Sequence, residues 1–353
     1  MATIDAYLIE VLEKRGSDLH FIAGDPARIR QYGDLSTLRP EKLAPEFVKD
    51  TLYEIMPKAA LERFESKDGA DFAHTIPERG RFRVNVMRQL NGMGAVFRAI
   101  PSKALTLDQL NMPEAVRQMS KANNGLILVT GKTGSGKSTT LAAMIDDINM
   151  RVRGHILTIE DPIEFVHHRK NCLISQREIG EHAPSFAAAL HSALREDPDV
   201  ILVGELRDLE TMSIAVTAAE MGILVMGTLH TNGAAQTVDR MVNVFPADKQ
   251  SHVRTMLSTS LRGVVSQQLL QKTDKSGRVA ALEILVNTAA AANLIRQGKL
   301  DQLENVMQAG GQFGMRTMDT AIQQLLDSRQ VTGKEAYKKG INKARFEAVK
   351  DIG

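Results

Sequence analysis

The spacing of apolar residues along the first hundred positions predicts a small α+β region. Helical spacing runs through residues 3–15, and a second helical stretch spans about 45–66. Within residues 80–88, the apolar side chains of Phe82, Val84 and Val86 alternate with the polar ones of Arg81, Arg83 and Asn85, which is the period of a half-buried strand. An Asn-Gly pair then predicts a hairpin turn, with 94–100 as the return strand. We therefore expect a first domain over residues 1–100.

The pattern changes beyond a proline-containing segment, residues 101–120, which we interpret as a linker. Apolar runs of strand length then alternate with amphipathic helices, an order that predicts a mostly parallel sheet covered on both faces. These runs are 126–130, 155–159, 200–203 and 223–228. The expected second domain is 121–353, mostly helical from about residue 270.

Composition narrows the class of protein. The chain has 353 residues, of which 43% are hydrophobic and 24% charged, as in ordinary globular proteins. Its net charge is 44 − 42 = +2, and only 4% of residues are aromatic, so we expect no direct contact with nucleic acid. The single cysteine, Cys172, excludes an intrachain disulfide framework and a multi-cysteine zinc site. Without a signal-like segment or an apolar run of ~18 residues, we expect a soluble protein of a reducing compartment with no transmembrane segment.

A glycine-rich motif follows the 126–130 run. Residues 131–138 read GKTGSGKS, which matches G-x-x-x-x-G-K-[ST] at every fixed position. The preceding apolar run and the following amphipathic helix are the context that this phosphate-binding loop requires. Glycines let backbone N–H groups converge on phosphate oxygens at a helix N-terminus. The expected nucleotide contacts are Gly131, Thr133, Gly134, Ser135, Gly136, Lys137, Ser138 and Thr139, with Lys137 on the β- and γ-phosphates and the Ser138 hydroxyl on Mg²⁺.

Carboxylates follow two of the later strands. One group, Glu160, Asp161 and Glu164, comes after the 155–159 run, and Glu205 ends the 200–203 run. Ligand sites in open α/β sheets lie outside the carboxyl ends of strands, so both positions suit catalysis or metal binding. Isolated carboxylates at such places often only cap helices or pair with lysines, and the phosphate loop favours the catalytic interpretation.

A histidine ends the fourth predicted strand. His230 lies in the sequence GTLHTN, and we expect it beside the phosphate-loop strand, where it would sense the γ-phosphate or a metal-bound water. A histidine at a strand terminus is more often structural than catalytic.

Taken together, these segments resemble the secretion ATPase superfamily and, within it, the PilT-type type IV pilus retraction motors. TGSGKSTT, TIEDPIEF, DPDVILVGELRD and GTLHTNGAAQTVDR are similar to the family's Walker A, Asp box, Walker B and His box, in the same order. SDLHF near the start and GGQFGMRTMDTAIQQL near the end also match, so the resemblance covers essentially the whole chain.

The resemblance implies a PAS-like N-terminal domain joined to a P-loop RecA-like ATPase domain, an α/β architecture assembled as a homohexamer. It implies ATP and Mg²⁺ as ligands, Glu164 as catalytic carboxylate, Glu205 on the metal through water, and His230 linking the γ-phosphate to domain movement. It also implies arginines that reach the nucleotide, for which Arg83 and Arg98 are the best matches, together with Arg195.

The implied work is ATP-driven pilus disassembly in twitching motility, at the cytoplasmic side of the inner membrane. The implied partner is a PilC-like platform protein, beside a paralogous motor in some systems. Two alternatives stay open: a paralogous motor for a pilus, secretion or DNA-uptake system, and a nucleotide-binding regulatory subunit that hydrolyses slowly.

The chain departs from the family pattern at a few positions. Lys132 stands where proline is usual, and Ile223 where histidine is usual. The retraction signature AIRNLIRE is AAANLIRQ over residues 290–297, with Ala292 for its first arginine and Gln297 for its glutamate.

Overall fold

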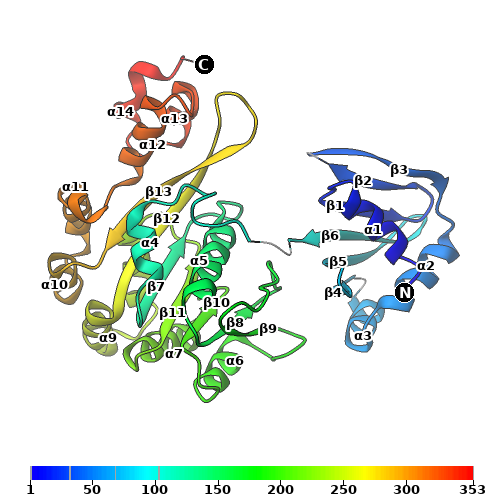
Figure 1. Ribbon diagram of the computed structural model, residues 1–353, viewed down its shortest axis with the longest axis horizontal. Coiled ribbons are helices and arrows are strands. Elements are labelled where there is room, and N and C mark those ends of the chain that lie inside the picture. The colour runs from blue at the N-terminus through cyan, green and yellow to red at the C-terminus, as the bar shows by residue number, and fades with distance from the viewer. Residues whose placement is uncertain (1, 32, 68, 102–103, 353) are drawn as a thin grey trace. The chain divides into compact units, whose positions relative to one another are not determined.

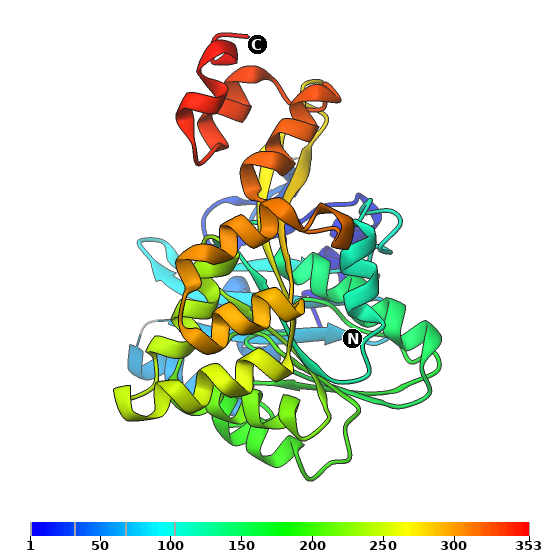
Figure 2. The same ribbon diagram turned by 90° about the vertical axis from the view of Figure 1, so that its left-hand side faces the viewer.

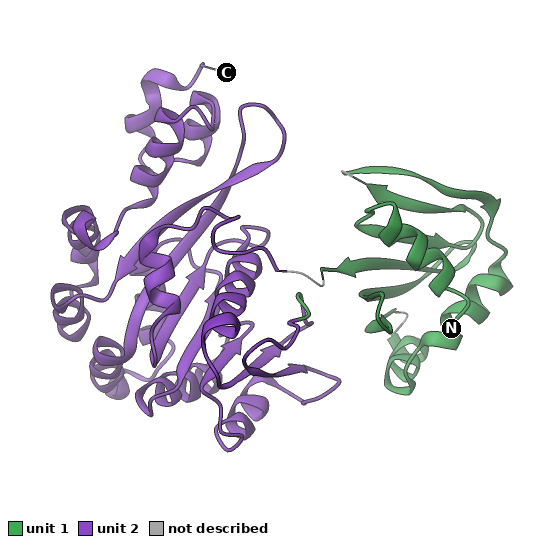
Figure 3. Cartoon of the chain, viewed as in Figure 1, with its two compact units in different colours: residues 1–103, 164–166 green, residues 104–163, 167–353 purple. Residues whose placement is uncertain are grey.

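The computed structural model describes residues 2–31, 33–67, 69–101 and 104–352. The chain forms two compact units (Figure 3). Unit 1 comprises residues 1–103 together with the short segment 164–166, and unit 2 comprises residues 104–163 and 167–353. Most of the segment that we interpreted as a linker therefore belongs to unit 2. Leu107, Met112 and the apolar side of the helix α4 (Glu114–Ser120) lie in its hydrophobic core.

Unit 1 is a six-stranded antiparallel sheet with three helices (Figure 1). The strand order is β3-β2-β1-β6-β5-β4. The bounds are α1 (Asp5–Glu13), β1 (Asp18–Ile22), β2 (Pro26–Gln31), β3 (Asp34–Lys42), α2 (Pro45–Ile55), α3 (Lys58–Lys67), β4 (Gly69–Ile76), β5 (Gly80–Gln89) and β6 (Gly92–Ile100). The predicted helix 45–66 is two helices, because Pro57 interrupts the backbone hydrogen bonding between α2 and α3.

Unit 2 is built on a seven-stranded sheet in the order β13-β12-β7-β11-β10-β8-β9. All neighbours pair in parallel except β13, which is antiparallel to β12. Its strands are β7 (Gly125–Thr130), β8 (His155–Glu160), β9 (Leu173–Glu178), β10 (Val200–Val203), β11 (Leu224–Leu229), β12 (Leu261–Gln271) and β13 (Arg278–Val286).

Helices cover both faces of this sheet, as Figures 1 and 2 show. They are α4 (Glu114–Ser120), α5 (Lys137–Arg151), α6 (Phe186–Ala193), α7 (Leu209–Glu220), α8 (Ala234–Asn243), α9 (Ala247–Ser260), α10 (Ala289–Gln297), α11 (Leu303–Ala309), α12 (Met318–Asp327), α13 (Gly333–Lys339) and α14 (Lys343–Phe346). Single 3₁₀ turns lie at Leu300–Gln302, Gly311–Phe313 and Glu347–Val349.

Alternate residues of β7 show how the two faces are filled. Leu126 and Leu128 pack in one hydrophobic cluster with α6 to α11, whereas Ile127 and Val129 pack in another with α4 and α5. Successive side chains of a strand point to opposite faces, so a strand covered on both sides must be apolar throughout. The continuous apolar runs of the sequence follow from this packing.

The helical part begins at α10, not near residue 270 as expected. Residues 261–286 form the β12–β13 hairpin, whose outer end is covered by the C-terminal helices α12 to α14 (Figures 1 and 2). A separate hydrophobic cluster joins them, in which Leu270 and Ala281 of the hairpin pack against Ile322 and Phe346. The hairpin thereby connects the centre of the sheet to the end of the chain.

Candidate functional site

The glycine-rich loop lies between β7 and α5, as its sequence predicts. Gly131, Gly134 and Gly136 have φ values of 139°, 77° and 90°, in the region that side chains disfavour. A Cβ atom on Gly131 would lie 2.4 Å from the main-chain oxygen of Gln267, and one on Gly136 would lie 2.6 Å from its side-chain nitrogen. The loop therefore packs directly on β12. At Gly131 the neighbour is main chain and leaves no room for a Cβ atom, and at both positions the positive φ favours glycine.

The polar groups of the loop suit an anion. The buried Lys137 amine donates to the main-chain oxygens of Gly131 and Lys132, at 2.9 and 3.3 Å. The Ser135 hydroxyl is buried without a hydrogen-bond partner in the described part of the chain. Buried polar groups normally have partners, so an orphaned hydroxyl in such a loop fits a bound phosphate. The other expected contacts lie on the same turn: Thr133 and Gly134 are exposed, and Ser138 and Thr139 are half-buried at the start of α5.

Three parallel strands end beside one another at this edge of the sheet. Leu229 of β11 pairs with Thr130 of β7, and Val203 of β10 pairs with Gly227 of β11. The residues that follow these strands are the phosphate loop, His230 and Glu205. Register alone therefore brings Walker A, His box and Walker B candidates to a common edge.

Glu205 and His230 are in contact. The Glu205 carboxylate lies 3.3 Å from Nε2 of His230 through one oxygen and 2.6 Å from Arg207 through the other. Burial acts to raise the pKa of Glu205, but the hydrogen bond from Arg207 and the nearby His230 outweigh it, so the pKa is lowered. The lowered pKa favours the ionised carboxylate, which can accept hydrogen bonds from water. Arg207, two residues after Glu205, was not predicted as a site residue.

The carboxylates after β8 divide between the units. Glu160 is buried in unit 2, where the Thr158 hydroxyl donates to it at 2.7 Å. Glu164 is exposed and belongs to unit 1 with its neighbours through 166, where the Val166 N–H donates to the Pro101 oxygen at 3.4 Å. The catalytic role of Glu164 stays a prediction.

The candidate arginines of unit 1 lie opposite each other. Arg83 of β5 pairs in register with Arg98 of β6. Each has an acidic partner: Arg83 Nε lies 3.7 Å from Asp71 and Arg98 Nε lies 2.9 Å from Asp18. The Arg98 side chain is 69% exposed, so its partner does not bury it. Arg195 is exposed in unit 2, in the turn that follows α6.

Comparison with known proteins identifies the family. A model of the family described as "Type II/IV secretion system protein" matches residues 1–348. This chain belongs to that family.

Relatives within the family agree with the resemblance to retraction motors. The type IV pilus retraction ATPase PilT of Pseudomonas aeruginosa is 50% identical over 333 residues, which cover 94% of this chain and 96% of PilT. A twitching motility protein of Neisseria gonorrhoeae is 49% identical, over 89% of this chain and 84% of its own length. A crystal structure of the retraction motor PilT with bound ADP is 41% identical, with a TM-score of 0.90 and 99% of both chains covered. The predicted secretion-ATPase fold, with a smaller N-terminal domain, is confirmed, as is the expectation of an ATPase.

One polar residue beside the phosphate loop was missed by sequence reasoning. Gln267 accepts a hydrogen bond from Thr140 of α5 at 2.8 Å, besides making the two close approaches to the loop glycines. It is buried although it is polar, and it lies on β12, which the sequence did not predict as a strand. A polar pair, Gln267-Gln268, inside an apolar run was the available signal.

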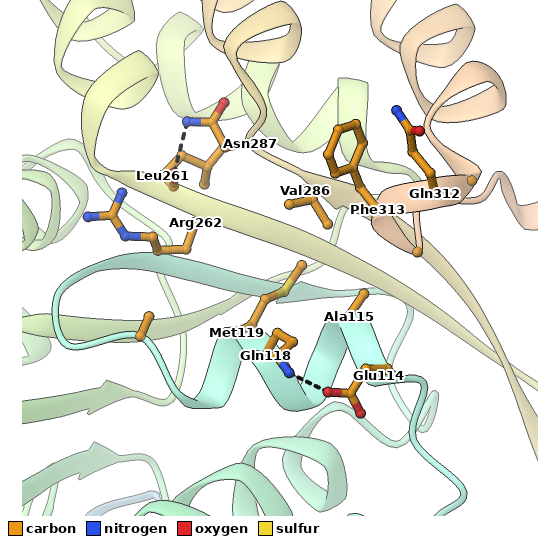
Figure 4. A pocket seen from close by; sticks show the side chains of 13 residues that line it. Glu114, Ala115, Gln118, Met119, Leu261, Arg262, Val286, Asn287, Gln312 and Phe313 are labelled. Carbon is orange, nitrogen blue, oxygen red and sulfur yellow. Dashed lines mark hydrogen bonds between the residues drawn. The ribbon is translucent and has the colours of Figure 1, made fainter.

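A cavity of about 670 Å³ lies elsewhere in unit 2 (Figure 4). Met119 of α4, Leu261 and Arg262 of β12, Asn287 and Phe313 line it. Leu261 pairs with Leu126, at the start of β7, whereas the phosphate loop follows the end of β7. The cavity and the nucleotide loop are therefore at opposite ends of the central strand.

The described residues contain neither a metal-binding cluster nor a helix that could span a membrane. No group of three or more metal-ligating side chains occurs there. No helix within the described ranges combines the length and apolar character needed to cross a bilayer.

Proposed function

We propose that this chain is an ATP-hydrolysing motor that powers type IV pilus retraction. The observation that carries the proposal is the common edge of the sheet, where the phosphate loop, His230 and an ionised Glu205 follow neighbouring parallel strands. High identity to PilT over nearly the whole of both chains supports the pilus as the object of the work.

The residues at this edge have distinct tasks in the proposal. Lys137 and the loop N–H groups bind the β- and γ-phosphates, with Gly131, Thr133, Gly134, Ser135, Gly136 and Thr139 shaping the loop. Ser138 would hold a bound Mg²⁺ directly, and Glu205 would hold it through water. A bound Mg²⁺ would neutralise charge on the phosphate oxygens.

Water activation and charge neutralisation complete the site. Glu164 orients the attacking water, while Arg83, Arg98 and Arg195 supply positive charge to the transferring phosphoryl group. His230 transmits the state of the γ-phosphate to the rest of the domain. These assignments rest on the motif positions and on the family.

The assembly is proposed from the family as well. The motor is a homohexamer at the cytoplasmic face of the inner membrane, where it acts on a PilC-like platform protein, beside a paralogous motor in some systems. Cycles of ATP binding and release rotate the two units of each chain against one another.

A secretion or DNA-uptake motor is the second candidate. The Legionella pneumophila ATPase DotB is 28% identical with a TM-score of 0.83, over 98% of this chain. The altered signature on α10, at Ala292 and Gln297, favours this candidate, because those residues differ from the retraction pattern.

The first test compares Mg²⁺-ATPase activity of the purified chain with that of Glu205→Ala, with the oligomeric mass measured in the same buffer. Turnover by a hexamer that is abolished in the variant supports the motor. ATP binding without Glu205-dependent turnover would instead indicate a slowly hydrolysing regulatory subunit.

A second test separates the two motors. Retraction is measured in cells that carry the chain or its Ala292→Arg variant. Retraction by either protein supports the pilus motor, and its absence in both, with ATPase activity intact, supports the secretion motor.

A further inference from the structure

A buried carboxylate on β13 joins the His230 loop to the C-terminal helices. Glu283 is only 6% exposed. Its Oε1 accepts from the main-chain N–H of Ala234 at 2.6 Å, and its Oε2 accepts from that of Met318 at 3.0 Å. These two residues are the first of α8 and of α12. One side chain therefore binds the N-terminal ends of two helices that are far apart in the sequence.

The carboxylate suits this double contact. Each helix N-terminus carries partial positive charge and unsatisfied N–H groups, so both favour an anion. Burial raises the pKa of Glu283, and the two N–H donors act in the opposite direction. No basic side chain of the described residues forms an ion pair with it. Its interactions with the protein are thus directed at the two helices.

One of these helices begins beside the nucleotide edge. Ala234 follows His230 by only a short loop, and Gly233 in that loop donates its N–H to the Ser266 hydroxyl at 2.9 Å. Ser266 pairs in register with Glu283 on one side and with Thr130, the last residue of β7, on the other. The loop after His230 is thus hydrogen-bonded to β12, which lies between the strand that leads into the phosphate loop and the strand that carries Glu283.

The other helix begins the C-terminal segment. Residues 318–349 comprise α12 to α14 and pack on the outer end of the β12–β13 hairpin as a separate hydrophobic cluster. Just before Met318, the main chain is attached to β13, because Ile284 and Arg316 exchange hydrogen bonds of 2.9 and 3.2 Å. The start of α12 is therefore held to β13 twice, by main-chain bonds at Arg316 and by the Glu283 side chain at Met318.

We propose that Glu283 is a positioning residue that couples the loop after His230 to the first turn of α12. A change at the nucleotide edge that moves the start of α8 then moves α12 through the shared carboxylate. This inference rests on the proposed function, because it takes His230 as the residue that responds to nucleotide. Couplings of this kind modulate equilibria by about 0.5–2 kcal/mol, or roughly 2–30-fold.

The test measures amide hydrogen exchange on the full chain with and without Mg²⁺-ADP. In the native chain, nucleotide slows exchange at the phosphate loop and changes it at residues 318–321. In Glu283→Gln, nucleotide still protects the phosphate loop, but the response at 318–321 is lost. The reason is that an amide offers an acceptor to only one of the N–H groups of Ala234 and Met318. We also expect kcat for ATP to fall about 2–30-fold with KM unchanged.

Thr317→Ala is the matched control. Thr317 caps the same helix, because its hydroxyl accepts a hydrogen bond from the Thr320 N–H. Removing this hydroxyl weakens the first turn of α12 but leaves the two hydrogen bonds of Glu283 in place. We expect faster exchange at 318–321 in this variant, with the nucleotide response and kcat retained. If Glu283→Gln fails to fold, Glu283→Asp serves instead, since its shorter carboxylate cannot reach both helices.

The outcomes separate the two proposals. Protection of the phosphate loop with no response at 318–321 in the native chain, or an equal response in both chains, overturns the coupling alone. Equal losses of kcat in Thr317→Ala and Glu283→Gln overturn it too. Absence of loop protection in the native chain overturns nucleotide binding and the coupling together.

Discussion

The nucleotide edge of unit 2 and the paired arginines of unit 1 hold their charged side chains in different ways. At the edge, Glu205 is in contact with both His230 and Arg207, and the phosphate loop rests on β12. On the β5–β6 pair, Arg83 and Arg98 lie opposite each other, and each is exposed beside a single carboxylate.

The two regions differ in how their charged groups are brought together. The edge is preorganised by strand register, so its groups are already close together within one unit. The two arginines are like charges directly opposite on neighbouring strands, an arrangement that is unfavourable in itself. Hydrogen bonds from Ser17 and Arg98 hold the pKa of Asp18 below its usual value in spite of its burial, so the compensating charge persists at low pH. In the proposed function, this pair contributes only when a phosphate group approaches it.

The largest expected effect is on the arginine pair. Arg98→Ala should reduce kcat by about 10³–10⁵-fold, because arginines that neutralise a transferring phosphoryl group contribute that much in other NTPases. Steady-state ATPase activity and nucleotide affinity measure the effect. Arg28→Ala is the control, since Arg28 is also a strand arginine of unit 1 with an acidic partner. Similar rates in both variants would show that the pair is an ordinary solvated surface.

A substitution on the buried face of β6 should change the stability of unit 1. Phe97→Ala removes a fully buried ring next to Arg98 and should lower the free energy of unfolding of unit 1 by about 3–5 kcal/mol. Denaturant unfolding measures it, with Arg83→Ala expected to leave stability almost unchanged, because Arg83 and its partner Asp71 are both exposed. Equal destabilisation by the two substitutions would contradict the division between the buried and exposed faces of the β5–β6 pair.

The contact between the phosphate loop and β12 is tested by Gly131→Ala. The new methyl group meets the Gln267 oxygen and the backbone is at φ 139°. We therefore expect the free energy of unfolding to fall by about 1–3 kcal/mol and ADP binding to weaken. Titration calorimetry measures the affinity. Gly180→Ala is the control, because Gly180 has φ 85° with open space around it. Normal affinity in Gly131→Ala would show that the close approach is unimportant.

The smallest expected effect is on the pH dependence of kcat. Arg207 lowers the pKa of Glu205, so the carboxylate stays charged down to lower pH than usual. Arg207→Ala should raise that pKa and move the acidic limb of the kcat profile to higher pH, with modest change near pH 7. Arg240→Ala, an exposed arginine of α8, should leave the profile in place. An unshifted limb in Arg207→Ala would mean that Glu205 does not limit turnover.

Sequence patterns predicted the parts of the fold that depend on local periodicity. The alternation around Phe82, Val84 and Val86 gave β5, and four apolar runs gave the central strands β7, β8, β10 and β11. The phosphate loop follows from its own glycines. Each of these signals lies within one short segment.

The missed elements depend on contacts between distant segments. β12 contains Ser266 and Gln267, whose polar side chains are buried because they bond to the His230 loop and to α5. A pattern based on apolar periodicity cannot anticipate polar residues that are satisfied by another part of the chain. The same reason hides Glu283, which carries no motif and whose two partners lie 49 and 35 residues away.

The way Lys137 is held bears on how freely the loop sequence can vary. Its amine binds main-chain oxygens, including that of Lys132, whose own side chain is exposed. Any amino acid, proline included, supplies that oxygen. Lysine in place of proline at position 132 therefore adds a positive charge and keeps this hydrogen bond. Gly131 next to it tolerates no such exchange, because a side chain there would meet the main chain of Gln267.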